Sequence, residues 1–255
     1  MPGPFRFHKF SRDKFPDWRC PACLNETLVL IPESFIEKQS LQTGKISGED
    51  WFEPYMYEGI FSCMLQCSRR DCRESVALIG ESGYEEEWDD QMRARTYECV
   101  LAAKAFLPPL PLFTATEKCP THIYDQLRKV SSLLPGHSSA AVNNLRIVLE
   151  MLMDELGVIR IYLEGKKNVR KEYTLNQRIQ NYSGDHQDMK PGFLAMKWLG
   201  NVGSHSPLNV SEQDIDAACQ ILDHFLVRIF SPTVDHSAEI ARLTRKYDPH
   251  FSGKP

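Results

Sequence analysis

Eight cysteines occur in the chain, and four of them form two closely spaced pairs. Cys20 and Cys23 make a C-x2-C pair, and Cys67 and Cys72 make a C-x4-C pair. Each short turn can present two thiolates to one side of a metal ion, so two turns complete the tetrahedral shell that zinc prefers. Four thiolates leave no position for water, so the spacing predicts a structural zinc ion rather than a catalytic one.

Cys63 leaves the composition of this ligand set open. It lies four residues before Cys67 and shares its strand parity, so it is either a ligand in place of Cys67 or a buried apolar thiol. The polar turn "CSRRDC" favours Cys67. Arg69 and Arg70 lie at the tip of this turn, where they are candidates for contact with nucleic acid or protein. The alternative is that the metal only holds a small sheet together.

The stretch "KWLGNVGSHSP", residues 197–207, is the second place where chemistry is expected. Its apolar positions predict a helix over 190–200 that stops at Gly200–Asn201. A tight turn carrying His205 would follow. A histidine beside Asn, Gly and Ser in such a turn is typical either of an acid–base site or of a well hydrogen-bonded turn.

The elements that must position these residues change character along the chain. Residues 58–68, 73–80 and 96–106 predict short strands around the cysteines. The acidic stretch "ESGYEEEWDDQ" is interpreted as a solvated loop or a sheet edge. The prolines of 107–120 indicate an extended linker, since they can continue neither a helix nor a central strand.

After Pro120 the apolar spacing becomes helical. Helices are expected over 120–134, around Leu145–Leu156, from a capping box at Thr174 and Gln177, over 190–200, from Ser211, and as a short tail in "SAEIARLTRKY". The predicted fold class is therefore α+β. A small β zinc-ribbon module over residues 1–112 precedes an all-α helical bundle over residues 113–255.

Composition narrows the function classes. The formal net charge is −4, which argues against a chain that binds nucleic acid or membrane over its whole surface. The N-terminal residues have no apolar segment typical of a signal peptide, and the most apolar stretch is broken by Lys104 and three prolines. Cysteines without a secretory signal predict a reducing compartment, so a cytoplasmic protein is expected.

One loop could still bind phosphates. The stretch "EGKKNVRKEY" carries four basic residues between predicted helices: Lys166, Lys167, Arg170 and Lys171. Such a cluster either contacts nucleic acid or is simply a solvated loop.

Several segments together resemble a known family. They are "NNLRIVLEMLMDELG", "LNQRI", "KWLGNVGSH" and "VSEQDIDAACQILDHFLVRIF", in this order. They resemble the bacterial family called domain of unknown function 4145, whose members commonly begin with a Cys-rich segment. That family is grouped with the HEPN helical superfamily, which includes many metal-independent RNases of defence systems. The resemblance implies a helical bundle that often pairs as a homodimer, and a role in bacterial defence or mobile elements.

The HEPN catalytic pattern, commonly R-N-x-x-x-H, is only partly present. Asn201 and His205 match it, but Gly200 stands where the arginine is expected. Arg146, with Glu150 one turn later, is a conceivable replacement that would hold a scissile phosphate. The alternative is that these four polar residues form a structural network.

Two functions therefore remain. The first is a non-catalytic binding or regulatory module that contacts protein partners or nucleic acid. The second is an RNase that uses His205 with Arg146. A purely structural homodimer is a third, weaker hypothesis.

Overall fold

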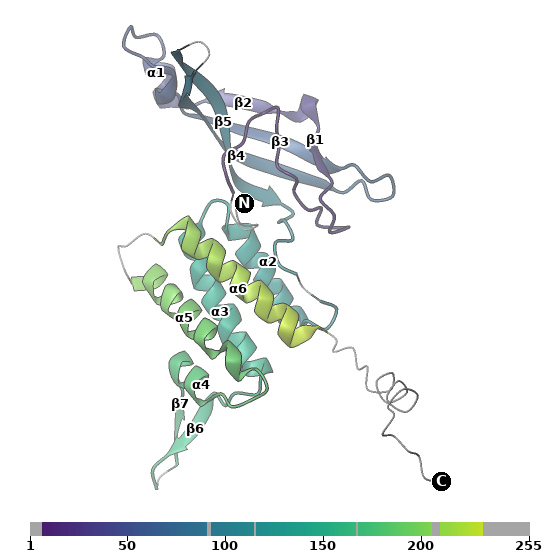
Figure 1. Cartoon of the computed structure of the whole chain (residues 1–255), viewed down its shortest axis with the longest axis vertical. Helices are drawn as coiled ribbons and strands as arrows, with labels where there is room; N and C mark the ends of the chain where they lie inside the picture. The colour runs from purple at the N-terminus through teal and green to yellow at the C-terminus, as the bar shows by residue number, and fades with distance from the viewer. Residues whose placement is uncertain (1–6, 91–92, 115, 167, 206–209, 232–255) are drawn as a thin grey trace, which may run out of the picture.

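The computed structural model shows a mixed α/β chain with a curled antiparallel sheet in its first part and mostly helices in its second (Figure 1). The residues that it describes are 7–90, 93–114, 116–166, 168–205 and 210–231. The short tail expected in "SAEIARLTRKY" lies outside these residues. Among the described residues, no helix is both long and apolar enough to cross a bilayer.

The sheet has five antiparallel strands: β1 (Leu28–Leu30), β2 (Ile36–Gln39), β3 (Gly59–Cys67), β4 (Ser75–Asp89) and β5 (Ala94–Leu107). Strand β3 is central, because β1 and β2 both pair with one of its edges and β4 with the other. A short helix, α1 (Leu41–Ile46), and two 3-10 turns at Pro32–Ser34 and Pro54–Met56 connect the strands. The predicted strands over 58–68, 73–80 and 96–106 all exist, although β4 and β5 are longer than expected.

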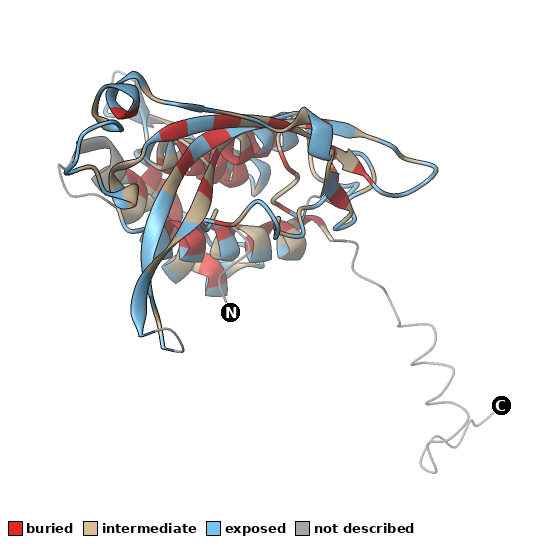
Figure 2. Ribbon diagram, turned by 90° about the horizontal axis from the view of Figure 1, so that it is seen from above, coloured by how far each residue is buried: buried red, intermediate tan, exposed pale blue. Residues whose placement is uncertain are grey.

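Alternation of side chains gives the sheet its covered face. Phe61, Cys63 and Leu65 are buried along β3, and the positions between them are more exposed, as a period of two requires. Figure 2 shows buried and exposed positions alternating along the long strands. The buried face is covered by the segment before β1, where Phe10 and Trp18 meet edge to face with ring centroids 5.3 Å apart.

The acidic stretch lies mainly in β4. Residues 81–89 continue this strand and pair with β5, whereas pairing with β3 ends at Ser82. Within the described part of the chain, the other edge of β4 has no strand partner beyond Ser82. The carboxylates are therefore carried on a long two-stranded extension rather than on a loop.

Gly80 is closely packed against its neighbours in this sheet, beside an irregularity in the β4–β5 register. A Cβ added there would lie 2.3 Å from the carbonyl oxygen of Ala102 and 2.4 Å from the ring of Phe61. We expect Gly80→Ala to lower the free energy of unfolding by about 2 kcal/mol, because backbone and core must both shift. Urea unfolding followed by circular dichroism measures this change.

Gly83→Ala in the same strand is the matched control. Its added Cβ would find its nearest atom, the carbonyl oxygen of Tyr57, at an ordinary 3.6 Å. We expect a change below about 0.5 kcal/mol for this variant. Equal effects of the two substitutions would contradict the packing argument.

The second part contains five helices and a hairpin within the described residues: α2 (Thr121–Leu133), α3 (Ser138–Glu155), β6 (Ile161–Glu164), β7 (Val169–Glu172), α4 (Leu175–Asn181), α5 (Lys190–His205) and α6 (Glu212–Phe230), with a 3-10 turn at Gln187–Met189 before α5. The predicted capping box is confirmed, since Thr174 and Gln177 satisfy each other's backbone N–H groups. Ser211 caps α6 by accepting a hydrogen bond from the Asp214 backbone N–H.

The predicted fold class is wrong. The cysteine-rich part is a curled five-stranded sheet rather than a small ribbon, and the helical part is not all-α, because β6 and β7 form an antiparallel hairpin within it. The charged stretch after α3 was expected to be a loop. It can form strands because Gly165 and Asn168 adopt positive φ angles of 70° and 48° in the turn, and because the rings of Tyr162 and Tyr173 stack 4.2 Å apart.

The predicted end of the helix at Gly200–Asn201 is also wrong. Helix α5 continues through both residues to His205, so the expected turn is helical. Glycine is a poor helix former, which is why it suggested an end. A glycine occupies position 200 because of packing between helices: a Cβ added there would lie 3.1 Å from the Cβ of Arg146 on α3.

Candidate metal centre and polar cluster

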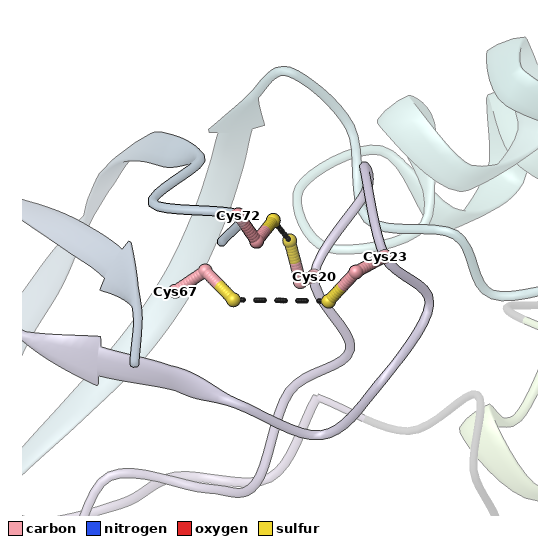
Figure 3. Close-up of side chains that lie close together, drawn as sticks. All are labelled: Cys20, Cys23, Cys67 and Cys72. Carbon is pink, nitrogen blue, oxygen red and sulfur yellow. Dashed lines mark hydrogen bonds between the residues drawn. The ribbon is translucent and has the colours of Figure 1, made fainter. Parts of the chain in front are cut away.

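The four predicted metal ligands meet at one end of the sheet. The sulfur atoms of Cys20, Cys23, Cys67 and Cys72 all lie within 4.8 Å of one another. Figure 3 shows the four side chains converging: Cys20 and Cys23 come from the loop before β1, Cys67 from the end of β3 and Cys72 from the connection between β3 and β4. This group could hold a metal ion.

The distances fit a tetrahedral ion. The Cys20 and Cys72 sulfurs are 3.6 Å apart, and those of Cys23 and Cys67 are 3.7 Å apart. A zinc–sulfur bond of about 2.3 Å places tetrahedral sulfurs about 3.8 Å from each other. The protein therefore holds the sulfurs close to the separation that an S4 centre requires.

Two backbone turns place these sulfurs. In the first, the N–H of Leu24 donates to the carbonyl of Cys20 at 2.9 Å, and Leu24 has a φ of 59°. In the second, the N–H groups of Cys72 and Arg73 both donate to the carbonyl of Arg69, and Arg73 has a φ of 55°. A left-handed residue after each turn reverses the chain locally, which aims both thiols of a pair to the same side.

The four thiols are not equivalent. Burial raises the pKa of Cys20 to about 12, whereas the backbone N–H of Asn25 helps to lower the pKa of Cys23 to about 5. The hydroxyl oxygen of Thr27 lies 3.1 Å from the Cys67 sulfur and 3.8 Å from that of Cys23. Thr27 thus supports two of the sulfurs, as residues outside the ligand set commonly do at metal centres.

Cys63 is not part of this group. It lies on the buried face of β3, 4% exposed, and burial raises its pKa to about 11. The structure therefore places Cys63 in the core and Cys67 among the converging sulfurs. Arg69 and Arg70 are exposed at the tip of the second turn.

The second predicted site brings α3 and α5 together. Arg146 donates a hydrogen bond from Nη1 to Oδ1 of Asn201, and its Nε lies 3.6 Å from Oε1 of Glu150. Glu150 also meets Arg160, with 3.4 Å between Oε2 and Nη2. Three of the four predicted residues are thus in one cluster, and the side chain of His205 lies outside what the structure describes.

Arg178 is a member of the adjoining polar network that sequence inspection missed. It is 2% exposed, and its guanidinium donates to Oδ1 of Asp154 at 2.5 Å and to the carbonyl oxygens of Val158 at 3.0 Å and Glu150 at 3.3 Å. It therefore joins α4 to the end of α3. A signal was present, because Leu175, Arg178 and Ile179 lie on one helical face that is otherwise apolar.

The predicted phosphate-binding residues fall in the β6–β7 hairpin. Lys166, Arg170 and Lys171 are exposed there, and Lys171 pairs with Glu164. Lys167 lies outside the described residues. Figure 1 shows the hairpin projecting from the end of the helical part away from the sheet, so the structure does not bring it together with Arg69 and Arg70.

Two family models match separate stretches of the chain. One, described as Domain of unknown function (DUF8608), matches residues 8–106. The other, described as Domain of unknown function (DUF4145), matches residues 129–248, which confirms the resemblance at the level of that family. Neither description mentions the HEPN superfamily or a zinc ribbon. No curated protein and no solved structure matches the chain.

Proposed function

We propose that this chain is a non-catalytic binding module that contacts nucleic acid through the β6–β7 hairpin, with zinc as a structural ion in the Cys20–Cys23–Cys67–Cys72 centre. The observation that carries the proposal is the exposed basic hairpin. Residues 160–173 hold five basic and two acidic residues in a chain whose net charge is −4. Local positive charge on a projecting element favours phosphate contact despite the overall charge.

The hairpin has suitable geometry for this role. A two-stranded ribbon is narrow enough to enter the major groove of duplex DNA, and its basic side chains can equally follow a single strand. The stacked pair Tyr162–Tyr173 stiffens its base, next to α4. A role in bacterial defence or mobile-element systems stays a prediction from the family resemblance.

Zinc is favoured as the ion by the donor set. Four cysteine sulfurs are typical of zinc or iron–sulfur centres, and four thiolates at tetrahedral spacing suit a single zinc ion. When bound, the ion would supply a rigid cross-link and no reactive water. The absence of an open coordination position is what supports a structural assignment.

Binding is tested by fluorescence anisotropy with labelled single-stranded RNA and with duplex DNA of the same length, over a range of salt concentrations. We expect Lys166→Gln/Arg170→Gln to weaken binding about tenfold at low salt. The slope of log K against log salt should fall by about 2 for the duplex, since two phosphate contacts are lost. If the double substitution weakens the affinity for one of the two nucleic acids more than for the other, that nucleic acid is the preferred one.

Lys38→Gln/Lys45→Gln is the matched control, because it removes the same charge from exposed positions of the sheet part. It should leave the affinity and the salt slope within twofold of the unmodified protein. If both double variants weaken binding equally, only net charge matters and the hairpin is not the binding site. Lack of binding at low salt would also overturn the proposal.

The RNase hypothesis is kept as a second candidate because Arg146 meets Asn201, which lies one helical turn before His205 in α5. Against it, Arg146 is already engaged by Asn201 and Glu150. The same RNA is incubated with the protein and with His205→Ala in EDTA, with circular dichroism to verify that the fold survives chelation. We expect no cleavage by either. Cleavage that is lost in His205→Ala would establish the RNase instead.

A further inference from the structure

A cleft of about 490 Å³ lies where the first cysteine turn, the proline-rich linker and α2 meet. Arg19, Pro21 and Leu24 line it from the cysteine turn, and the linker from Pro108 to Thr114 forms another wall. A volume of this size falls within the range of about 300–1000 Å³ that is typical of sites for small organic molecules.

Helix α2 presents a row of hydrogen-bond donors to this cleft. Tyr124, Arg128 and Ser131 all line it, and their spacing of four and three residues places them on one helical face. Ser131 lines the cleft as a residue that is 4% exposed, and its hydroxyl makes no hydrogen bond to any residue that the structure describes. Arg128 likewise has no ion pair with a described residue. The Ser131 hydroxyl and the exposed Arg128 guanidinium are therefore both available to donate hydrogen bonds to a ligand in the cleft.

The opposite wall is apolar and held in position. Leu110, Leu112 and Phe113 line the cleft with the linker prolines. Thr114 fixes the end of this wall to α6, since its N–H and hydroxyl donate to the carboxylate of Asp223 at 2.5 and 3.1 Å. The cleft is therefore formed before any ligand arrives, which reduces the entropy lost on binding.

Charges around the cleft orient a ligand. Arg19 is engaged by Glu26, with 3.7 Å between Nε and Oε1. Glu74 is the carboxylate among the described lining residues, and it enters from the sheet part beside the second cysteine turn. Negative charge on a ligand is thus unfavourable next to Glu74 and favourable next to Arg128 on α2.

We propose that this cleft binds a small amphipathic organic anion. The apolar body of the ligand lies along the linker wall, and its carboxylate or phosphate accepts hydrogen bonds from Arg128, Ser131 and Tyr124. The site is separate from the β6–β7 hairpin, so it does not depend on nucleic-acid binding.

The test uses the full metal-bound chain and the fluorescent aryl anion anilinonaphthalene sulfonate. We expect one saturable site, with affinity about tenfold weaker in Arg128→Gln and about threefold weaker in Ser131→Ala. Lys129→Gln is the matched control, because it removes a neighbouring exposed charge from α2 that does not line the cleft. Circular dichroism and thermal melting verify that each variant is folded.

Competition with charged and neutral naphthyl compounds distinguishes recognition of the ligand's negative charge from recognition of its apolar body. Naphthoate and naphthyl phosphate should displace the probe, and neutral naphthylmethanol at the same concentration should not. Equal effects of Arg128→Gln and Lys129→Gln would overturn the proposal, since the probe would then lie elsewhere, for example on the exposed isoleucines of the sheet. Displacement by the neutral alcohol as readily as by naphthoate would also overturn it.

Discussion

We expect Cys67→Ser to abolish metal binding and to lower the free energy of unfolding by about 4 kcal/mol or more. The Cys67 sulfur is one of the four that converge, and serine cannot supply a thiolate. Without the proposed ion, the first cysteine turn would lose its cross-link to β3. This loss would also loosen the segment carrying Phe10 and Trp18, which covers the sheet. Metal content by plasma emission spectrometry and stability by urea unfolding measure the two effects.

Cys63→Ser is the matched control for this prediction. The same chemical change is made in the same strand and at another buried position, so the burial of a hydroxyl contributes to both variants. We expect it to retain one zinc ion per chain and to lose only about 1 kcal/mol. Retention of zinc by Cys67→Ser with loss in Cys63→Ser would reassign the ligand set.

The second large effect is expected at Asp154. Asp154→Ala leaves the buried guanidinium of Arg178 with backbone carbonyls as its described partners, which should lower the free energy of unfolding by about 3 kcal/mol. The cause is an uncompensated charge in a position that is 2% exposed. Asp125→Ala, the same substitution at an exposed position of α2, should change stability by less than about 0.5 kcal/mol.

A double variant distinguishes charge burial from simple loss of contacts. If the unpaired guanidinium causes the loss, Asp154→Ala/Arg178→Met should be more stable than Asp154→Ala alone by at least about 1 kcal/mol, because methionine removes the buried charge and fills its volume. A double variant that is less stable than the single one would show that the carbonyl contacts of Arg178 outweigh the charge. Urea unfolding of all the variants under one set of conditions provides the comparison.

Features that depend on neighbours in sequence were predictable. The cysteine spacings identified Cys20, Cys23, Cys67 and Cys72, because the turns that aim each pair of thiols are only a few residues long. The capping box at Thr174 was equally local. Alternation along residues 58–68 indicated a strand, since one face of β3 is covered and the other is not.

Features that depend on tertiary contacts were not predictable from the sequence. Gly200 suggested a helix end, but its cause is the approach of α5 to Arg146 on α3, which no local pattern reveals. The hairpin β6–β7 was hidden by its charge, and the stacked tyrosines that close it are eleven positions apart. The cleft beside α2 joins residues from three distant segments. Arg128 and Ser131 therefore looked like ordinary helix positions.

The pairing of Phe10 with Leu101 sets an order of events during synthesis. Two backbone hydrogen bonds, of 3.0 and 2.7 Å, join these residues, although most of the sequence of the sheet part lies between them. The segment carrying Phe10 is synthesised before β5, yet it cannot dock on β5 until that strand has emerged. Both cysteine pairs are available once residue 72 has emerged, so the proposed metal ion could bind to the nascent chain while Phe10 and Trp18 are still exposed. Domains fold as units as they emerge, and exposed apolar surface promotes aggregation. Metal binding at this stage would hold the two cysteine turns together and so restrict the conformations of the aromatic segment before β5 is available.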